Sequence, residues 1–469
     1  MSYNDTINYL YSLQKHGIKL GLENTVRLLS CFGNPQNDFP SIHVAGTNGK
    51  GSTSAMTASI LQSAGFKVGL FTSPHLVSFT ERVRINNEEI TENEVVELAD
   101  EIKSKVESLK LEVKSSNSGT FEPTFFEVVT AMGFLYFKRK NVDLAVVETG
   151  MGGRLDATNV LMPEVSVITS VSHDHKEFLG DTISAIAGEK AGIIKQGIPV
   201  VTALQEPAVM DIIEKRAREK GADLFVYGKD FSVETKKEDI SGSVFDYFGD
   251  CKFKGIRITL AGRHQILNAS LALKTSEILI KRAASYASRL TPAVFKAGLE
   301  NIRWPGRLEF ISDNPPIVID GAHNPSASSV LADSLRKDFL KAYPGIILIM
   351  AIMSDKDIKG IMSPLLPLAS EIIFTTPAYE RAAQPEILAR HAADLGFTNT
   401  HIARTVKDAI EMATAKAEIR DLGLGVSRTN PQTLNPKPLI LITGSFYTIG
   451  EAVEVLGGKG VLSRLRETV

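Results

Sequence analysis

The chain has 469 residues, of which 43% are hydrophobic and 23% are charged. These proportions are typical of soluble globular proteins, and the length allows two or three domains of ~150 residues each. The formal net charge of −2 gives no global positive field for nucleic acid. The two cysteines, Cys31 and Cys251, are far apart, which argues for a reducing compartment and against a disulfide scaffold or a cysteine-based zinc site.

The sequence also gives no sign of export or membrane insertion. The N-terminal stretch MSYNDTINYLYSLQK has neither an apolar segment nor a small-residue cleavage site, so it does not predict a secretory signal. No apolar run approaches the ~18 residues that a membrane span needs. We therefore expect a cytoplasmic protein that binds small molecules rather than nucleic acid or membranes. Without a long exposed apolar stripe, we expect a monomer.

Short runs rich in Val and Ile alternate with helical patterns in the first part of the chain. Such runs predict a parallel sheet covered by helices on both faces. The expected strands are 41–46, 67–71, 142–148, 164–170 and 198–203, and the expected helices include 53–64 and 183–195. Residues 231–260 instead alternate polar and apolar side chains, which predicts antiparallel strands at the edge of this sheet.

A break in the pattern predicts a second domain. Pro305 and Gly306 forbid a continuous helix in the segment NIRWPGRLEF, so we place the boundary near residue 300, giving domains 1–300 and 301–469. Strand patterns then return at 316–320, 345–351, 371–376 and 438–445. The expected fold class is α/β, with a phosphate-loop-type, mostly parallel sheet domain followed by a smaller Rossmann-like domain. The Gly-, Asn- and Pro-rich residues 421–438 predict a surface loop.

The segment IHVAGTNGKGS, residues 42–52, has the character of a phosphate-binding loop. A strand ends at Ala45 and a helix is expected near Ser52, with three glycines between them. Glycines let backbone N–H groups approach phosphate oxygens, and the following helix N-terminus adds partial positive charge. Lys50 is placed to reach terminal phosphates and Ser52 to contact magnesium. The spacing is shorter than that of the usual phosphate loop, and the alternative is a tight turn with a surface lysine.

Three polar side chains at predicted strand ends suggest a magnesium site. Ser73 follows the second strand, Glu148 closes a buried strand, and His175 lies in the loop TSVSHDHKEFLG. Oxygen ligands favour Mg²⁺, whereas two histidines two residues apart, without a third ligand cluster, do not make a zinc site. The alternatives are a simple Ser-Pro turn, a helix-capping glutamate and a hydrogen-bonded histidine. Near Glu148, Arg154 and Asp156 also have the charges for a structural ion pair.

Further candidate residues lie in later segments. Lys190 falls inside an otherwise apolar helix, where an unpaired ammonium is costly, so the simple alternative is a salt bridge with Glu189 or another carboxylate. Asp320 and His323 follow a strand of the second domain, just before a helix. Other candidates are Arg307 at the domain boundary and Asn268 on a helix of the first domain, although each has a structural alternative, as a surface charge or a helix-face hydrogen bond.

Together these segments resemble the folylpolyglutamate synthase and dihydrofolate synthase family, within the superfamily of Mur ligases. The resemblance runs from about residue 7 to residue 456, in the family's order. It is carried by GIKLGLENT, HVAGTNGKGS, TSPHLVSFTERVRI, TFFEVVTA, ETGMGGRLDATN, DHKEFLG, GEKAGIIK, WPGRLE, DGAHNP and TGSFYTIGEA. The enzymes of this family are ATP-dependent amide ligases that join L-glutamate to a pteroate or folate carboxylate.

The resemblance implies roles for individual residues. The expected catalytic residues are Lys50, Lys190 and His323. The expected ATP ligands are Gly46, Thr47, Asn48, Gly49, Lys50, Gly51, Ser52, Asn268, Arg307 and Asp320. Mg²⁺ is expected on Ser73, Glu148, His175 and Lys190, the last as a carbamate formed with CO2. The pteroate is expected beside Leu20, Gly21, Leu22, Thr124, Leu155 and Asp156. The resemblance also allows for a monovalent cation. The departures from the family's pattern are the 421–438 loop and His173.

Two other functions were weighed against this one. A peptidoglycan Mur ligase carries a nucleotide-sugar domain before the ATP loop, whereas only 45 residues precede Gly46 here, too few for a domain of ~100 residues. A non-catalytic GTPase-like switch needs a guanine-reading Asn-Lys-x-Asp segment, and the sequence contains none. The resemblance implies that ATP activates a carboxylate as an acyl phosphate, which the glutamate amine then attacks.

Overall fold

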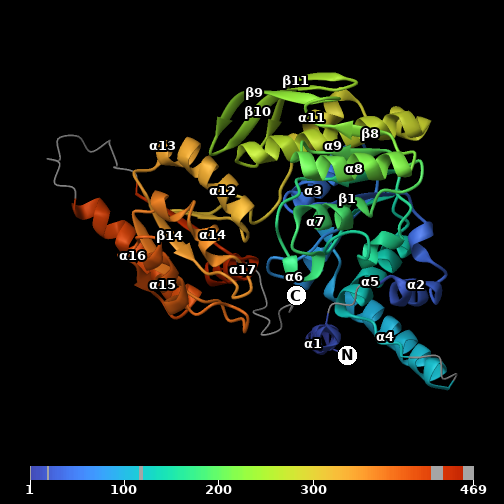
Figure 1. Cartoon of the computed structure of the whole chain (residues 1–469), viewed down its shortest axis with the longest axis horizontal. Helices are drawn as coiled ribbons and strands as arrows, with labels where there is room; N and C mark the ends of the chain where they lie inside the picture. Colours follow the sequence, from blue (N-terminus) through green and yellow to red (C-terminus); the bar gives the residue numbers. More distant parts are fainter. Residues whose placement is uncertain (1, 18–20, 116–119, 424–436, 458–469) are drawn as a thin grey trace.

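The computed structural model describes residues 2–17, 21–115, 120–423 and 437–457 (Figure 1). Its first part is built on an eight-stranded sheet in the order β4-β3-β2-β5-β1-β6-β7-β8, parallel from β2 to β8. The strands are β1 Ser41–Ala45, β2 Val68–Phe71, β3 Val83–Ile85, β4 Glu88–Glu89, β5 Leu144–Glu148, β6 Val165–Ile168, β7 Val200–Thr202 and β8 Leu224–Val226. The five strands predicted in this region are confirmed.

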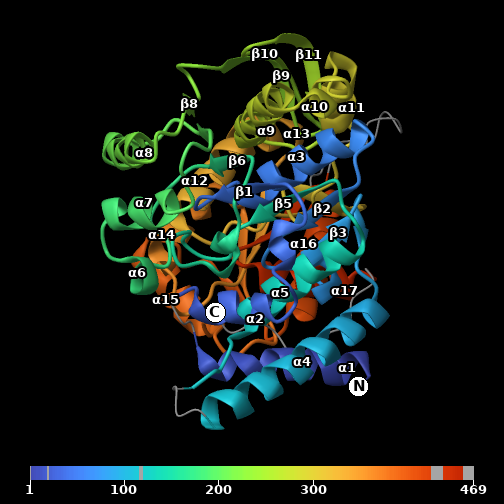
Figure 2. The ribbon, with the colours of Figure 1, turned by 90° about the vertical axis from the view of Figure 1, so that its right-hand side faces the viewer.

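Alternate side chains of the buried strands enter two different cores. In β5, Leu144 and Val146 join the cluster beneath α3, α9 and α11, while Ala145 and Val147 join the cluster beneath α4 and α5. Successive strand residues point to opposite faces, so a continuous apolar run requires helices on both sides. Figure 2 shows α9, α10 and α11 on one side of this sheet and α1, α2 and α4 on the other.

The helices of this part follow the predicted pattern, with shifted ends. The helix expected at 53–64 begins at Lys50, because Gly49 takes the left-handed conformation with φ 89°. The helices are α1 Tyr3–Ser12, α2 Glu23–Ser30, α3 Lys50–Ser63, α4 Glu92–Ser115, α5 Phe125–Arg139, α6 Lys176–Leu179, α7 Ile183–Ala191, α8 Pro207–Glu219, α9 Arg263–Arg282, α10 Ala284–Ala287 and α11 Pro292–Glu300. Short 3-10 turns are η1 Leu13–His16, η2 Pro35–Asn37, η3 Phe79–Arg82 and η4 Ala157–Val160.

The antiparallel strands predicted within 231–260 are present, but their predicted place at the edge of the large sheet is wrong. They form a separate three-stranded sheet in the order β11-β10-β9. Its strands are β9 Ser232–Asp239, β10 Gly242–Phe248 and β11 Lys252–Ile258. Its buried residues, among them Phe245 and Phe253, share the core of α9 and α11. Alternation reveals a half-buried strand, but it does not say which neighbour covers the apolar face.

The remaining part of the chain forms a six-stranded sheet in the order β12-β13-β17-β14-β15-β16, parallel except for β12. Its strands are β12 Glu309–Asp313, β13 Pro316–Ile319, β14 Ile346–Met350, β15 Glu371–Phe374, β16 His401–Ile402 and β17 Leu439–Thr443. The helical segments are α12 Pro325–Ser334, the π-helical η5 Leu335–Phe339, α13 Leu340–Ala342, α14 Ile358–Met362, η6 Leu366–Leu368, α15 Pro385–Asp394, α16 Val406–Gly423 and α17 Phe446–Val455. The four strands predicted here are confirmed.

The boundary predicted near residue 300 stays a prediction; it falls in the segment that joins α11 to β12. The predicted loop at 421–438 is wrong for 421–423, because α16 continues to Gly423, and residues 424–436 lie outside the described part of the chain. Within the described residues, no helix combines the length and the apolar character that crossing a membrane requires.

Candidate active site

A cavity of about 390 Å³ lies between the eight-stranded and the six-stranded sheets, at the carboxyl ends of their parallel strands. Ligands of open α/β sheets bind at this edge. The cavity brings together most residues predicted from the sequence: Gly21, Gly46, Thr47, Asn48, Gly49, Lys50, Gly51, Ser52, Ser73, Thr124, Glu148, Leu155, Asp156, His175, Lys190, Asn268, Arg307, Asp320 and His323. Leu22 is not in its wall, because the chain turns there to begin α2, and Leu20 lies outside the described residues.

The loop between β1 and α3 has the conformation that a phosphate site requires. Gly49 has a positive φ, and a Cβ atom there would lie 2.4 Å from Oδ1 of Asn268. Only glycine therefore fits between the loop and α9. The amide of Thr47 donates to the carbonyl of Ser170 at 2.8 Å, and this hydrogen bond fixes the start of the loop. The N-terminus of α3 then points its free N–H groups and partial positive charge at the cavity.

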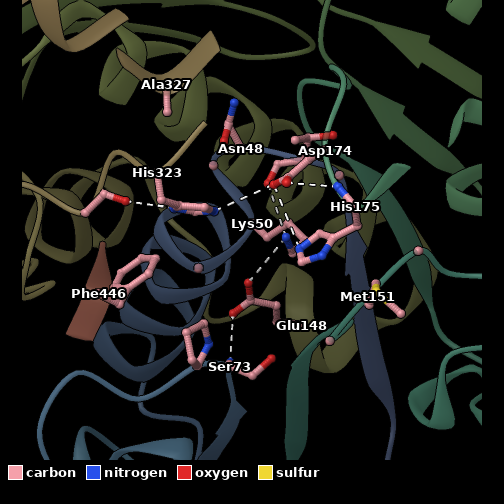
Figure 3. Close-up of a pocket in the computed structure, with 18 of the residues that line it drawn as sticks. Asn48, Lys50, Ser73, Glu148, Met151, Asp174, His175, His323, Ala327 and Phe446 are labelled. Carbon is pink, nitrogen blue, oxygen red and sulfur yellow. Dashed lines mark hydrogen bonds and ion pairs between the residues drawn. The ribbon is translucent and has the colours of Figure 1, made fainter. Parts of the chain in front are cut away.

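Lys50 lies between this loop and the carboxylate of Glu148. Its Nζ donates to the carbonyl of Thr47 at 3.2 Å and lies 4.0 Å from Oε1 of Glu148. Glu148 ends β5 and is 4% exposed. Burial raises the pKa of Glu148 to about 7, although Lys50 opposes this shift. The amide of Ser73 donates to Oε2 of Glu148 at 3.3 Å, so the ends of two neighbouring strands meet here, as Figure 3 shows.

Lys190 is buried in the wall of the same cavity without a carboxylate partner. Its Nζ donates to the carbonyl of Gly46 at 2.8 Å, and no carboxylate of the described residues lies within ion-pair distance. Burial, assisted by Lys50, lowers the pKa of Lys190 to about 7. The expected alternative, a pair with Glu189, is wrong because Glu189 pairs with Arg154 at 2.7 Å.

The same contact overturns the suggested pairing of Arg154 with Asp156. The carboxylate of Asp156 accepts instead from the amides of Met151, at 2.8 Å, and Thr158, at 3.0 Å. Asp156 therefore fixes the glycine-rich loop from within, while it also lines the cavity. Thr124 lines the same region and caps α5 through the amide of Glu127.

His175 lies in the loop between β6 and α6, next to Lys50 and Asp174 (Figure 3). Its φ of 47° is left-handed, and its amide donates to its neighbour Asp174 at 2.9 Å. Burial lowers the pKa of His175 to about 4, although Asp174 opposes this shift. The imidazole is therefore neutral near pH 7, the form in which a histidine binds metal ions.

The donor set fits magnesium better than a metal held by protein ligands alone. Among the described residues, no group of three or more His, Cys, Asp or Glu side chains is arranged to hold a metal ion. Zinc and calcium sites need such a group, whereas Mg²⁺ usually binds one or two carboxylates and takes its other ligands from water and phosphate. Ser73, Glu148 and His175 line one cavity next to a phosphate-type loop. The residues present therefore fit Mg²⁺ bound together with a nucleotide.

The six-stranded sheet contributes a second set of polar groups. Asp320, at the end of β13, accepts from the amides of Leu308 at 3.1 Å and Ala322 at 2.9 Å. The guanidinium of Arg307 lies 4.8 Å from the ring centroid of Phe446 and is partly buried, so it is not the surface charge considered above. Nδ1 of His323 lies 2.9 Å from the carbonyl of Gly321, a contact that places the ring proton on Nδ1.

Asn268 completes the set predicted from the sequence. It lies on α9, is 5% exposed, and its Nδ2 donates to Oε1 of Gln265 at 3.0 Å. Its Oδ1 faces Gly49 of the phosphate-type loop. The loop and α9 therefore form one wall of the cavity, and the six-stranded part forms the wall that faces them.

Comparison with known proteins agrees with this geometry. The model of the Mur ligase middle domain matches residues 44–275, and that of the Mur ligase glutamate ligase domain matches residues 306–427. The dihydrofolate synthase/folylpolyglutamate synthase of Bacillus subtilis is 36% identical over 96% of this chain and 98% of its own length. This chain belongs to the folylpolyglutamate synthase/dihydrofolate synthase family of Mur ligases. It is therefore an ATP-dependent ligase by family.

Solved structures of the family have the same fold. A Mycobacterium tuberculosis folylpolyglutamate synthase complexed with ADP superposes with a TM-score of 0.88 at 32% identity, covering 98% of this chain and 100% of that one. An FPGS–AMPPCP–folate complex superposes with a TM-score of 0.78 at 32% identity and the same coverage. The predicted α/β fold class, with Mur ligase architecture, is confirmed.

Two residues of this folylpolyglutamate synthase-like site were not predicted from the sequence. Asp174 accepts from Lys356 at 2.9 Å, and Lys356 lies in the loop after β14. Asp174 was visible only as the residue between His173 and His175. The sequence pointed to Lys356 even less clearly, since it is only a lysine shortly after a buried strand. Their pairing depends on the packing of two sheets, which neither local pattern contains.

Proposed function

We propose that this ligase joins L-glutamate to the carboxylate of dihydropteroate, of folates, or of both, through an acyl phosphate. The observation that carries the proposal is the single cavity in which a phosphate-type loop, Lys50, Glu148 and Lys190 face the second sheet. Relatives named dihydrofolate synthase/folylpolyglutamate synthase, similar over nearly their full length, support the choice of substrates. The named complexes with ADP, AMPPCP and folate support the nucleotide and the folate.

In this proposal the triphosphate of ATP lies along the β1–α3 loop. The backbone N–H groups of residues 46–52 and the N-terminus of α3 receive the phosphate oxygens, while Lys50 offsets their charge. Asn268, beside the loop, and Arg307 and Asp320, across the cavity, hold the rest of the nucleotide. Arg307 is the cation among these three, and we assign it to a phosphate.

Ser73, Glu148 and His175 would hold Mg²⁺ beside those phosphates. When bound, the ion supplies charge neutralisation at the transferred phosphoryl group. We further propose that the neutral amine of Lys190 forms an N–C bond to CO2 and releases one proton to solvent, which gives a carbamate. A buried amine with a pKa near 7 is partly neutral, and Lys190 has no carboxylate partner in the described structure. The carbamate converts a costly buried cation into an anion that can face the metal. We place a monovalent cation, where one is needed, in the same region.

The pteroate portion would lie on the other side of Glu148. Gly21, Thr124, Leu155 and Asp156 line this part of the cavity. Asp156 is an acceptor among apolar neighbours, which suits a pterin ring with N–H donors.

The first step is transfer of the γ-phosphoryl group. A carboxylate oxygen of the substrate forms a bond to the γ-phosphorus, the bond to the bridging oxygen breaks, and ADP leaves. This chain's contribution is alignment and charge: the loop and Lys50 hold the phosphates in line with the carboxylate. An acyl phosphate hydrolyses readily, so the two sheet domains must keep water out, with residues 301–307 as the hinge between them.

The second step forms the amide. The amine nitrogen of glutamate attacks the acyl carbon, the bond from that carbon to the phosphate oxygen breaks, and inorganic phosphate leaves as the nitrogen loses a proton. We assign His323 to this step, because its Nδ1 is held by Gly321 and its Nε2 faces Asp174 at 3.6 Å, within the cavity.

One coupled assay tests the proposal. The protein is incubated with ATP, Mg²⁺, L-glutamate and either dihydropteroate or tetrahydrofolate, and ADP is followed. ADP formation that requires both glutamate and one of the pterins supports the proposal, and the pterin used shows whether one or both reactions are catalysed. Glutamate-independent turnover would indicate a nucleotide switch, and a requirement for a muramyl nucleotide would indicate a peptidoglycan ligase.

A further inference from the structure

The carboxylate of Asp174 is the meeting point of three side chains from the other side of the cavity. Nζ of Lys356 donates to Oδ1 at 2.9 Å, Nδ2 of Asn324 donates to Oδ2 at 3.2 Å, and Nε2 of His323 lies 3.6 Å from Oδ2. The side chain of Asp174 is 9% exposed. Figure 3 shows Asp174 between His323 and His175. A largely buried carboxylate thus obtains its cationic and amide partners from a different sheet domain.

These contacts cross from one domain to the other. Asp174 lies in the loop between β6 and α6 of the first domain, whereas His323 and Asn324 follow β13 and Lys356 follows β14 of the second. Asn324 also donates to Oδ1 of Asn48, in the phosphate-type loop, at 3.0 Å. Separating the domains would leave the Asp174 carboxylate without these three partners, and an unpaired carboxylate is costly unless water replaces them.

Asp174 also contacts the imidazole of His323. The imidazole is held at Nδ1 by the carbonyl of Gly321, within its own domain, and its Nε2 faces Asp174, in the other. The ring lies 5.4 Å from the centroid of Phe446. The second domain thus holds the ring by itself, and Asp174 adds a contact at Nε2 that is attractive when the imidazole carries a proton on both nitrogens.

We propose that Asp174 is a positioning residue that couples domain closure to the alignment of His323 and Lys356 over the reacting groups. It acts through these partners. The inference rests on the proposed ligase function, because the benefit of closure is protection and alignment of an acyl phosphate. It gives a role to Asp174, the acidic residue of the VSHDH segment, which we assign neither to phosphate binding nor to metal binding.

The test measures the distance between the domains in the full chain. Nitroxide labels are attached to Lys215→Cys on α8 and Lys407→Cys on α16, in a protein that also carries Cys31→Ser and Cys251→Ser, and their separation is measured by pulsed electron paramagnetic resonance. The probes are AMPPCP with Mg²⁺, and dihydropteroate. Asp174→Asn, which removes the charge and keeps the shape, is compared with the parent in the same labelled background.

The parent is expected to give one short, narrow distance distribution with the ligands bound, and Asp174→Asn a longer and broader one. We expect kcat to fall about 100-fold while KM for ATP changes less than about threefold, since the phosphate-type loop stays intact. Lys356→Met removes the partner from the other side without touching the His175 loop, and we expect the same change in distance. Combining the two variants should add little further change, because they break one contact.

Asp355→Asn is the matched control. Asp355 neighbours Lys356 but pairs with Arg381 of its own domain at 3.1 Å, so the distance distribution should match that of the parent. Unchanged distances in Asp174→Asn and Lys356→Met would overturn the proposal. A loss of activity in Asp174→Asn that Lys356→Met does not share would also overturn it, because the effect would then be local to His175. Absence of glutamate-dependent ADP formation in the parent would refute the ligase function. The distances between the labels would still show whether Asp174 holds the two domains together.

Discussion

Lys190 directs its ammonium nitrogen at the carbonyl oxygen of Gly46, at 2.8 Å, where the phosphate-type loop begins. This contact satisfies one of the three donors of an ammonium group. It leaves the charge itself uncompensated, since the side chain is 4% exposed and the adjacent Glu189 is taken by Arg154. Burial thus lowers the pKa of Lys190 to about 7, so a large fraction of the amine is neutral at that pH.

A neutral amine can add CO2, which leads to the first prediction. After equilibration with isotopically labelled CO2, nuclear magnetic resonance should detect a protein carbamate that Lys190→Met lacks. Lys195→Met is the matched control, because Lys195 is also partly buried, with a pKa lowered to about 8 by burial, yet it bonds the carbonyl of Asn159 outside the cavity. The signal should weaken as the pH falls below about 7, since the protonated amine does not add CO2. A signal that persists in Lys190→Met would refute this assignment.

Lys50→Met should abolish ADP formation with little change in stability. Lys50 makes one bond to the carbonyl of Thr47, and its contact with Glu148 is 4.0 Å long, so few native interactions are lost. We expect a fall in kcat of about 1,000-fold or more, because charge stabilisation at the transferred phosphate is removed. The thermal midpoint should stay within about 2 °C of the parent. The exposed Lys229→Met serves as the control for charge loss, and turnover retained in Lys50→Met would rule out the loop's role.

The sequence was most informative where a strand and its function share one local pattern. Glu148 closes a buried apolar run, so its place at the carboxyl edge of a parallel sheet follows from the strand itself. The phosphate-type loop could be predicted for the same reason, because its glycines lie directly between a strand and a helix. The sheet order was not predictable in this way, since it depends on which strands pack together.

The failures involve partners that are distant in the chain. Arg154 and Asp156 are close in sequence, but Arg154 pairs with Glu189 on α7, and Asp156 bonds loop amides. Charge patterns give the sign of a partner and not its identity. Likewise, nothing local to Asp174 indicates Lys356, because their contact exists only after two domains have packed.

The single tryptophan, Trp304, should report nucleotide binding. A Cβ atom on Gly51 of the phosphate-type loop would lie 3.0 Å from its indole ring, and the guanidinium of Arg84 lies 5.6 Å from the ring centroid. Because the indole is only partly buried, AMPPCP with Mg²⁺ should exclude water and shift its emission to shorter wavelengths. Trp304→Phe should lose the signal and still bind AMPPCP in calorimetry. No shift at a concentration that calorimetry shows to be saturating would place the phosphates away from Gly51.

His43 should make the fold sensitive to acid. It is fully buried on β1, its Nε2 lies 2.8 Å from Oγ1 of Thr158, and burial lowers its pKa to about 3. The unfolded chain binds a proton below pH ~6.5 and the folded chain does not, so stability is lost as the pH falls from about 6.5 towards 3. The loss from this group is ~2 kcal/mol at pH 5.

His43→Gln removes this titration, so its free energy of unfolding should fall less steeply between pH 6.5 and pH 4, whatever its value at pH 7.5. Chemical unfolding at several pH values measures the slope. A slope equal to that of the parent would show that His43 takes up a proton in the folded state.

Gly450 on α17 should prove intolerant of even a methyl group, because α17 packs directly on the loop that follows Ser73. A Cβ atom at Gly450 would lie 2.2 Å from the carbonyl oxygen of Leu76. That loop cannot easily retreat, since the carboxylate of Glu81 accepts from the amides of three successive residues, Leu76, Val77 and Ser78, at 2.9, 2.7 and 2.7 Å. In Gly450→Ala the clash must therefore move α17 or the loop that carries Ser73.

We expect Gly450→Ala to lower the free energy of unfolding by ~1–3 kcal/mol and to reduce kcat about 10-fold, as in other overpacked contacts. Gly188→Ala is the control, because Gly188 lies inside α7 with open space around its Cβ position. Alanine there should instead stabilise the protein by ~0.5–1 kcal/mol through helix propensity. Thermal unfolding and the ADP assay measure both variants. If both alanine variants raised the free energy of unfolding equally, the contact between Gly450 and Leu76 would have room for a methyl group. α17 would then not hold the Ser73 loop in place.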